Sequence, residues 1–141
     1  MVQKRKIVYD KSPNSKQKIV AARIFLIDGT GALVTAALLS LALARHEALF
    51  EMKPDILYFL ASLAVLFALY SFTNAFLKPK NRRQPLKAVV WANTSYCLLT
   101  LGLVIYYYHT LTLLGIAYFM GEIVVILLLV RLETKVIRTY T

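Results

Sequence analysis

Two carboxyl side chains, Asp28 and Glu122, lie inside long apolar stretches of this 141-residue chain and are the residues best suited to chemistry there. A carboxyl group in an apolar slab can exchange a proton, accept hydrogen bonds or neutralise a bound cation. An ionised carboxylate near the middle of a membrane helix costs about 3 kcal/mol on insertion scales. A hydrogen bond between membrane helices returns only about 0.6 kcal/mol. The sequence therefore favours a functional polar site, and the alternative is a neutral Glu122 that hydrogen-bonds Asn93 or Tyr96 and holds helices together.

Uncharged polar side chains occur at similar depths in the other apolar stretches. Tyr118 precedes Glu122 by four residues and so shares its helical face. Asn74, Asn93 and Tyr96 fall in the same half of the second and third stretches. If these groups turn inward, they form one polar pocket that is open or nearly open to the cytoplasm. The predicted ligand-binding residues are Asp28, Asn74, Asn93, Tyr96, Tyr118 and Glu122.

Four apolar segments must position these side chains, and each is long enough to cross a bilayer. Crossing about 30 Å takes about 20 residues of helix, and a backbone in lipid must satisfy its own hydrogen bonds, which favours helices. The fold class predicted is all-α, a four-helix antiparallel transmembrane bundle. Its expected parts are a basic N-terminal arm (1–23), a membrane domain (24–133) with spans at about 24–44, 56–77, 88–108 and 110–130, and a tail (134–141).

Small residues predict which spans pack closely. Glycines at 29 and 31 give the first span a small face, and glycines at 115 and 121 do the same for the fourth. Such faces let membrane helices approach and form hydrogen bonds across the gap. We therefore expect the first and fourth spans to pair, with Asp28 and Glu122 on the shared side.

The basic residues predict the orientation. All but two of the 17 Lys and Arg residues fall in the arm, in the loop between the second and third spans, or after the fourth span. Cytoplasmic loops carry this excess, so both termini and that loop are expected in the cytoplasm, where they contact anionic lipid head groups. No basic segment shows the aromatic interleaving of a nucleic-acid-binding module, so nucleic acid is not an expected partner. The expected location is the plasma membrane, as a multi-pass protein of a bacterial inner membrane.

Signatures of catalysis and of cofactor binding do not occur in the sequence. There is no nucleophile elbow, zinc-protease motif or phosphate-binding loop, so no catalytic residue and no cofactor is predicted, and the chain is not expected to be an enzyme. Cys97 is the single cysteine and cannot form an internal disulfide. His46 and His109 fall at the outer face without further ligands, so no metal site is predicted.

The segments around the acidic residues carry a resemblance. The chain from about 24 to 133 resembles uncharacterised small four-span bacterial inner-membrane proteins, and this resemblance implies a four-helix membrane protein with no known activity. The motifs that carry it are Asp28-Gly29-x-Gly31-Ala32, Asn93-x-x-Tyr96-Cys97 and Tyr118-Phe119-x-x-Glu122.

Three functions are compatible with these patterns. The leading hypothesis is a carrier or binding protein for a proton, a cation or a cationic small molecule, which exchanges a carboxyl proton for the ligand charge. The second is a non-catalytic accessory or structural membrane subunit, with a homo-oligomer or a membrane partner. The third, with least support, is an enzyme that acts on a lipid.

Overall fold

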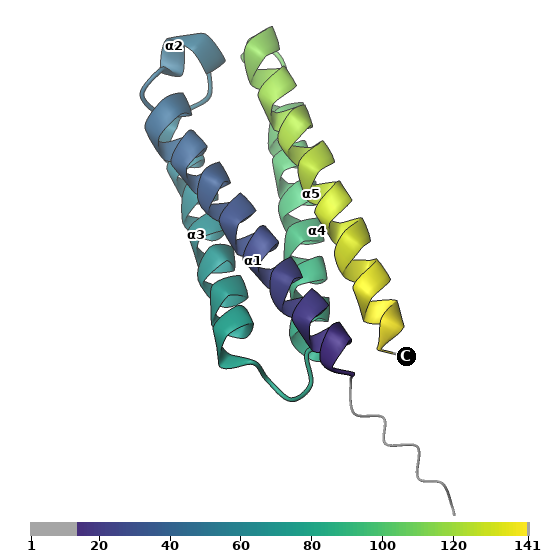
Figure 1. Ribbon diagram of the computed structural model, residues 1–141. Helices are drawn as coiled ribbons and strands as arrows, with labels where there is room; N and C mark the ends of the chain where they lie inside the picture. Colours follow the sequence, from purple (N-terminus) through teal and green to yellow (C-terminus); the bar gives the residue numbers. More distant parts are fainter. Residues whose placement is uncertain (1–13, 141) are drawn as a thin grey trace, which may run out of the picture.

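The computed structural model of the chain describes residues 14–140, and every long element in that range is a helix (Figure 1). This confirms the predicted all-α, four-helix antiparallel bundle. Most of the predicted N-terminal arm lies outside the described residues. The elements are α1 (Ser15–Ala37), which continues as the π-helical segment η1 (Leu38–Leu43), the short α2 (Glu47–Phe50), α3 (Pro54–Leu77), α4 (Arg83–Tyr106) and α5 (Leu113–Thr139).

The residues at the helix ends explain where the helices begin and stop. Asn14 precedes α1, and its backbone N–H donates to the Gln17 side chain at 3.1 Å, which satisfies a group left free at a helix start. Pro54 opens α3, a position where the missing N–H costs nothing. The Thr112 hydroxyl accepts from the Gly115 backbone N–H at the start of α5. Local sequence thus fixes the boundaries of the membrane helices.

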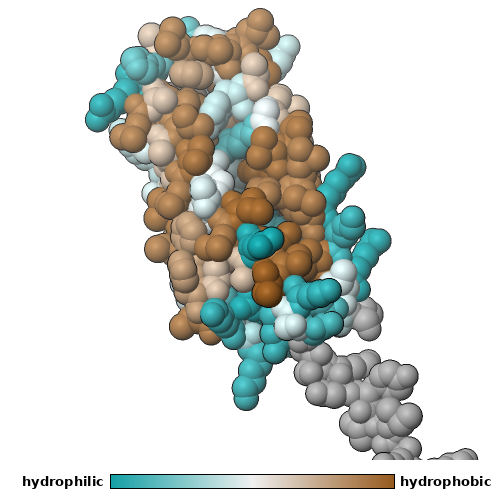
Figure 2. All heavy atoms as spheres, viewed as in Figure 1, coloured by the Kyte–Doolittle hydropathy of each residue, from teal (hydrophilic) through white to brown (hydrophobic). Residues whose placement is uncertain are grey.

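The outer surface identifies the chain as an integral membrane protein. Within residues 14–140, four helices are long and apolar enough to cross a bilayer: α1 with η1, α3, α4 and α5. Their outward faces expose large apolar side chains, for example Leu66 at 59% and Ile105 at 67%. Figure 2 shows large brown areas on both sides of a paler strip, with many hydrophilic residues toward the lower end of the molecule. A soluble monomer rarely exposes so large an apolar surface.

The four long helices pack as two close pairs. Helix α1 lies along α3, and α4 lies along α5 (Figure 1). The expected close pairing of the first and fourth spans is therefore wrong. Gly29 instead faces α3, where a Cβ atom would lie 3.1 Å from the ring of Phe72. Gly31 does face α5, but a Cβ atom there would be 3.8 Å from Leu129, an ordinary contact distance.

Two apolar clusters fill the bundle at its opposite ends. The larger cluster lies beside η1 and α2 and includes Leu39, Leu43, Leu57, Leu60 and Phe119. The smaller one, here called the terminal cluster, lies near both ends of the described chain and consists of Ala21, Phe25, Ala75, Leu86, Val89 and Val136. Polar side chains occupy the region between the two clusters.

Hydrogen bonds hold the first turn of α1 against the far end of the chain. The Tyr140 hydroxyl donates to the Gln17 carbonyl at 3.0 Å, and the Gln17 amide donates to the Thr139 carbonyl at 2.8 Å. From the α3–α4 loop, Arg82 Nη1 donates to the Lys18 carbonyl at 2.9 Å. Burial raises the pKa of the Tyr140 phenol, and the nearby Arg82 guanidinium opposes that shift. These contacts put residues 14–18 and 138–140 at the same end of the bundle.

Candidate functional site

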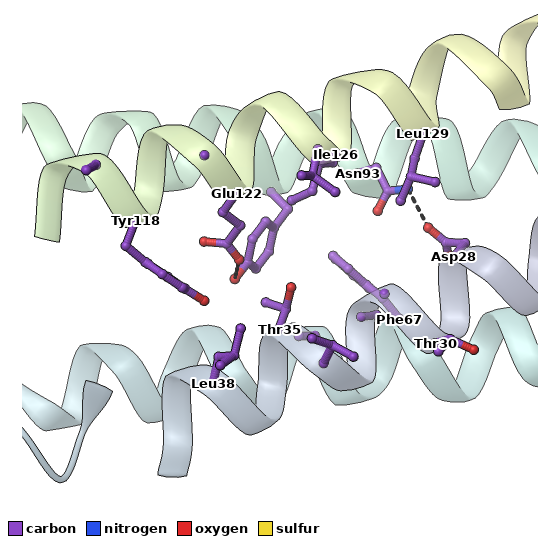
Figure 3. Close-up of a pocket in the computed structure, with 18 residues that line it drawn as sticks. Asp28, Thr30, Thr35, Leu38, Phe67, Asn93, Tyr118, Glu122, Ile126 and Leu129 are labelled. Atoms are coloured by element: carbon purple, nitrogen blue, oxygen red, sulfur yellow. Dashed lines mark hydrogen bonds between the residues drawn. The ribbon is translucent and has the colours of Figure 1, made fainter. Parts of the chain in front are cut away.

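A cavity of about 550 Å³ lies between α1 and α5, and most of the predicted site residues line it (Figure 3). Its floor consists of buried or half-buried side chains from α3 and α4, among them Ala64 and Phe67. Most of the lining surface is apolar. The predicted residues that line it are Asp28, Asn93, Tyr96, Tyr118 and Glu122.

The cavity opens to the side of the bundle. Among the described residues, its exposed lining side chains come from α1, its continuation η1, and α5, for example Val34, Leu38 and Val125. Toward the termini, the terminal cluster fills the interior with apolar side chains. The expectation of an opening at that end is therefore wrong for the described residues. Figure 2 shows a pale, less hydrophobic strip between brown walls on this face of the molecule.

Asp28 belongs to a buried polar network that joins all four long helices. One oxygen of Asp28 (Oδ1) accepts a hydrogen bond from the amide of Asn93 on α4 at 2.8 Å, and the other accepts from the Ser71 hydroxyl on α3. The same amide nitrogen of Asn93 lies 3.3 Å from a carboxyl oxygen of Glu133 on α5. The four side chains, here called the polar node, are all buried. Two acids that share one amide donor must lie close together.

Glu122 has a different environment. Its side chain is 9% exposed and points into the cavity from α5 (Figure 3). One carboxyl oxygen accepts a hydrogen bond from the Tyr96 hydroxyl at 3.1 Å. The other oxygen, Oε2, is buried and has no hydrogen-bond partner within residues 14–140. A buried acceptor without a partner carries a free-energy cost of about 1–3 kcal/mol. The carboxyl group that carries this oxygen lines the cavity.

Tyr118 and Thr35 add polar groups beside Glu122. Both side chains point into the cavity in Figure 3, Tyr118 from α5 and Thr35 from α1. Tyr118 was predicted from its spacing to Glu122. The cavity is also lined by three aromatic rings, those of Phe67, Tyr96 and Tyr118.

Asn74 lies apart from the other predicted site residues. Its amide donates to the Tyr70 carbonyl within α3 at 2.8 Å, and Asn74 does not line the cavity. Ser71, one turn earlier, takes the inward position instead. A period of 3.6 residues restricts which polar residues of α3 face inward, but several neighbouring polar residues left this choice open.

Sequence reasoning missed Glu133, which is fully buried. The fourth span was expected to end near residue 130, whereas α5 continues to Thr139. Glu133 lies in this added part of the helix, and its side chain points into the bundle, where it contacts Asn93. The available signal was helical spacing, because Glu133 follows Glu122 by 11 residues, close to three full turns, and so lies on the same face.

The part of the chain described by the structure contains no group of three or more His, Cys, Asp or Glu residues arranged to hold a metal ion. His46 and His109 are both exposed, and Cys97 is a buried free thiol. Comparison of the chain with known protein families, curated proteins and solved structures finds no match. The functional argument therefore depends on the geometry of the cavity.

Proposed function

We propose that the protein binds a lipophilic organic cation in the cavity between α1 and α5, with the cationic group against Glu122. The observation that carries this proposal is the Glu122 carboxyl group, which lines a largely apolar cavity and has one oxygen without a hydrogen-bond partner within residues 14–140. A cation there would neutralise the carboxylate.

The lining favours an organic cation over a metal ion. A hard metal ion takes six or more oxygen ligands, whereas this part of the cavity offers Glu122 and a few neutral hydroxyl groups. Apolar walls and aromatic rings suit a ligand with an apolar body, and aromatic faces attract cations by about 0.5–2 kcal/mol. A cavity of about 550 Å³ is within the size range of small-molecule sites.

Exchange of a proton for the ligand would turn such a site into a carrier. Glu122 would hold a proton in the empty state and release it when the cation enters. We propose that both termini face the cytoplasm, because the basic residues gather at that end of the bundle. The location proposed is a bacterial inner membrane.

A binding experiment tests the proposal directly. Tetraphenylphosphonium, an aromatic monocation, is titrated by calorimetry into the full-length protein in detergent micelles. Loss of one member of a buried charge pair costs about 2–5 kcal/mol, so Glu122→Gln should weaken binding by about 30-fold or more. Glu47→Gln removes the same charge from an exposed position and should leave binding unchanged. Equal affinities for the wild type and Glu122→Gln would refute the proposal.

The second candidate function is an accessory or structural subunit, and the polar node favours it. This network joins α1, α3, α4 and α5 through Asp28, Ser71, Asn93 and Glu133, as expected of a group whose role is to hold helices together. This function predicts no binding of the organic cation and a stoichiometric partner, or a second copy, after extraction in mild detergent. A monomer that binds the cation would exclude it.

A further inference from the structure

A second hollow, of about 350 Å³, lies at the end of the bundle where the described chain begins and ends. It lies between the first turns of α1 and the loop that joins α3 to α4. Four of the described residues that line it are cationic, and none of them is acidic. The lining residues are Lys18, Ile19, Ala22, Lys78, Pro79, Lys80 and Arg82.

Arg82 distinguishes this hollow from an ordinary basic surface. Arg82 is only 3% exposed, and guanidinium groups are seldom buried unless they are paired. Its Nη1 donates to the Lys18 carbonyl, but its Nε has no hydrogen-bond partner within residues 14–140. The buried acids Asp28, Glu122 and Glu133 make their hydrogen bonds in the polar node and the cavity, and not with Arg82. A buried guanidinium that lines a hollow together with three lysines suits an anion.

The surroundings indicate the kind of anion. Ile19 is 56% exposed, and Leu77, the residue before Lys78, is 75% exposed. Apolar side chains thus flank a cationic hollow at one end of four membrane helices, at the level expected for lipid head groups. The hollow has a volume of about 350 Å³. A water molecule takes up about 30 Å³ in the liquid, so a phosphate group, which is the size of a few water molecules, leaves part of the hollow free.

We infer that this hollow binds the phosphate head group of an anionic phospholipid. The phosphate would lie between Arg82 and the lysines at 78 and 80, with the acyl chains along Ile19 and the adjoining apolar surface. This site is separate from the cavity that contains Glu122, so either proposal can fail without the other. The sequence predicted contact between anionic lipids and whole basic segments of the chain. Here that contact is assigned to one hollow.

The test compares two double variants that lose the same charge. Lys78→Gln with Lys80→Gln removes two lining residues, while Lys16→Gln with Lys135→Gln removes two exposed lysines of the same end that do not line the hollow. Arg82 stays in place because it also holds Lys18. Native mass spectrometry of the full-length protein in micelles measures the first bound phosphatidylglycerol, with phosphatidylcholine as the neutral lipid.

The wild type should prefer phosphatidylglycerol. A lysine near an anionic lipid contributes about 1 kcal/mol, which is a factor of about five, so the lining double variant should weaken this binding by about 30-fold. The distant double variant should weaken it by no more than about three-fold. Equal losses would show diffuse attraction by surface charge and would overturn the inference. Binding of inorganic phosphate to the protein in lipid-free micelles, with the same affinity as phosphatidylglycerol, would also overturn the inference. The hollow would then recognise free phosphate.

Discussion

The polar node gives the sharpest prediction, because the chain supplies a matched control for it. Asn93→Leu removes one buried amide whose nitrogen lies 2.8 Å from an oxygen of Asp28 and 3.3 Å from an oxygen of Glu133. Interhelical hydrogen bonds in membrane proteins average about 0.6 kcal/mol and reach about 1.7 kcal/mol. Both contacts are lost together, and two carboxyl oxygens lose a donor, so we expect the free energy of unfolding to fall by about 2 kcal/mol.

Asn74→Leu is the control. Asn74 is the same residue type in a neighbouring helix, but its amide donates only to the Tyr70 carbonyl within α3. Its loss should change the free energy of unfolding by no more than about 0.5 kcal/mol. Unfolding by sodium dodecyl sulfate in mixed micelles, followed by far-ultraviolet circular dichroism, measures both variants. Equal losses, or no loss for Asn93→Leu, would show that the polar node does not hold the helices together.

Two further predictions concern packing and pH. Gly29→Ala should destabilise the protein by about 1–3 kcal/mol, because the new methyl group meets the Phe72 ring at 3.1 Å; Gly102→Ala, which meets nothing within 4 Å, should be neutral or stabilising by up to about 1 kcal/mol in the same unfolding assay. Burial raises the pKa of Tyr140, so its contribution to stability should be complete below about pH 10 and fall as the pH rises through the folded-state pKa. The difference in stability between the wild type and Tyr140→Phe should therefore shrink above that pH. A difference that grows with pH would contradict the burial of the Tyr140 phenol and its hydrogen bond to Gln17.

The sequence was sufficient to predict the four helices because bilayer thickness and backbone hydrogen bonding leave few other structures for four long apolar segments. It was also sufficient to predict that Glu122 turns inward, because a carboxylate against acyl chains is too costly. The pairing of helices was not predictable in the same way. Glycines mark faces that allow close approach, but the position of Phe72 decided that Gly29 packs against α3.

The candidate site was predictable to a similar extent. One cavity is lined by five of the six predicted residues, namely Asp28, Asn93, Tyr96, Tyr118 and Glu122. The direction of its opening depends on which apolar side chains fill the bundle ends, and hydropathy does not distinguish a side chain in the core from one that faces lipid. Helix boundaries beyond the apolar core are equally hard to place, because the flanking residues of a membrane helix can be as polar as a tail.

The hydrogen bonds of the three buried acids separate a structural from a binding role. The Asp28 contacts with Ser71 and Asn93 join α1 to its close partner α3 and also to α4 in the other pair. The Glu122 contact with Tyr96 lies within the α4–α5 pair, which already packs closely. A hydrogen bond that links helices already in contact adds little to the assembly of the bundle, yet Glu122 and Glu133 each leave one buried oxygen without a partner within residues 14–140. Of these two acids, Glu122 lines the cavity and Glu133 does not. Stabilisation accounts well for Asp28 and poorly for Glu122, and for that reason Glu122 is the residue on which a ligand is proposed to bind.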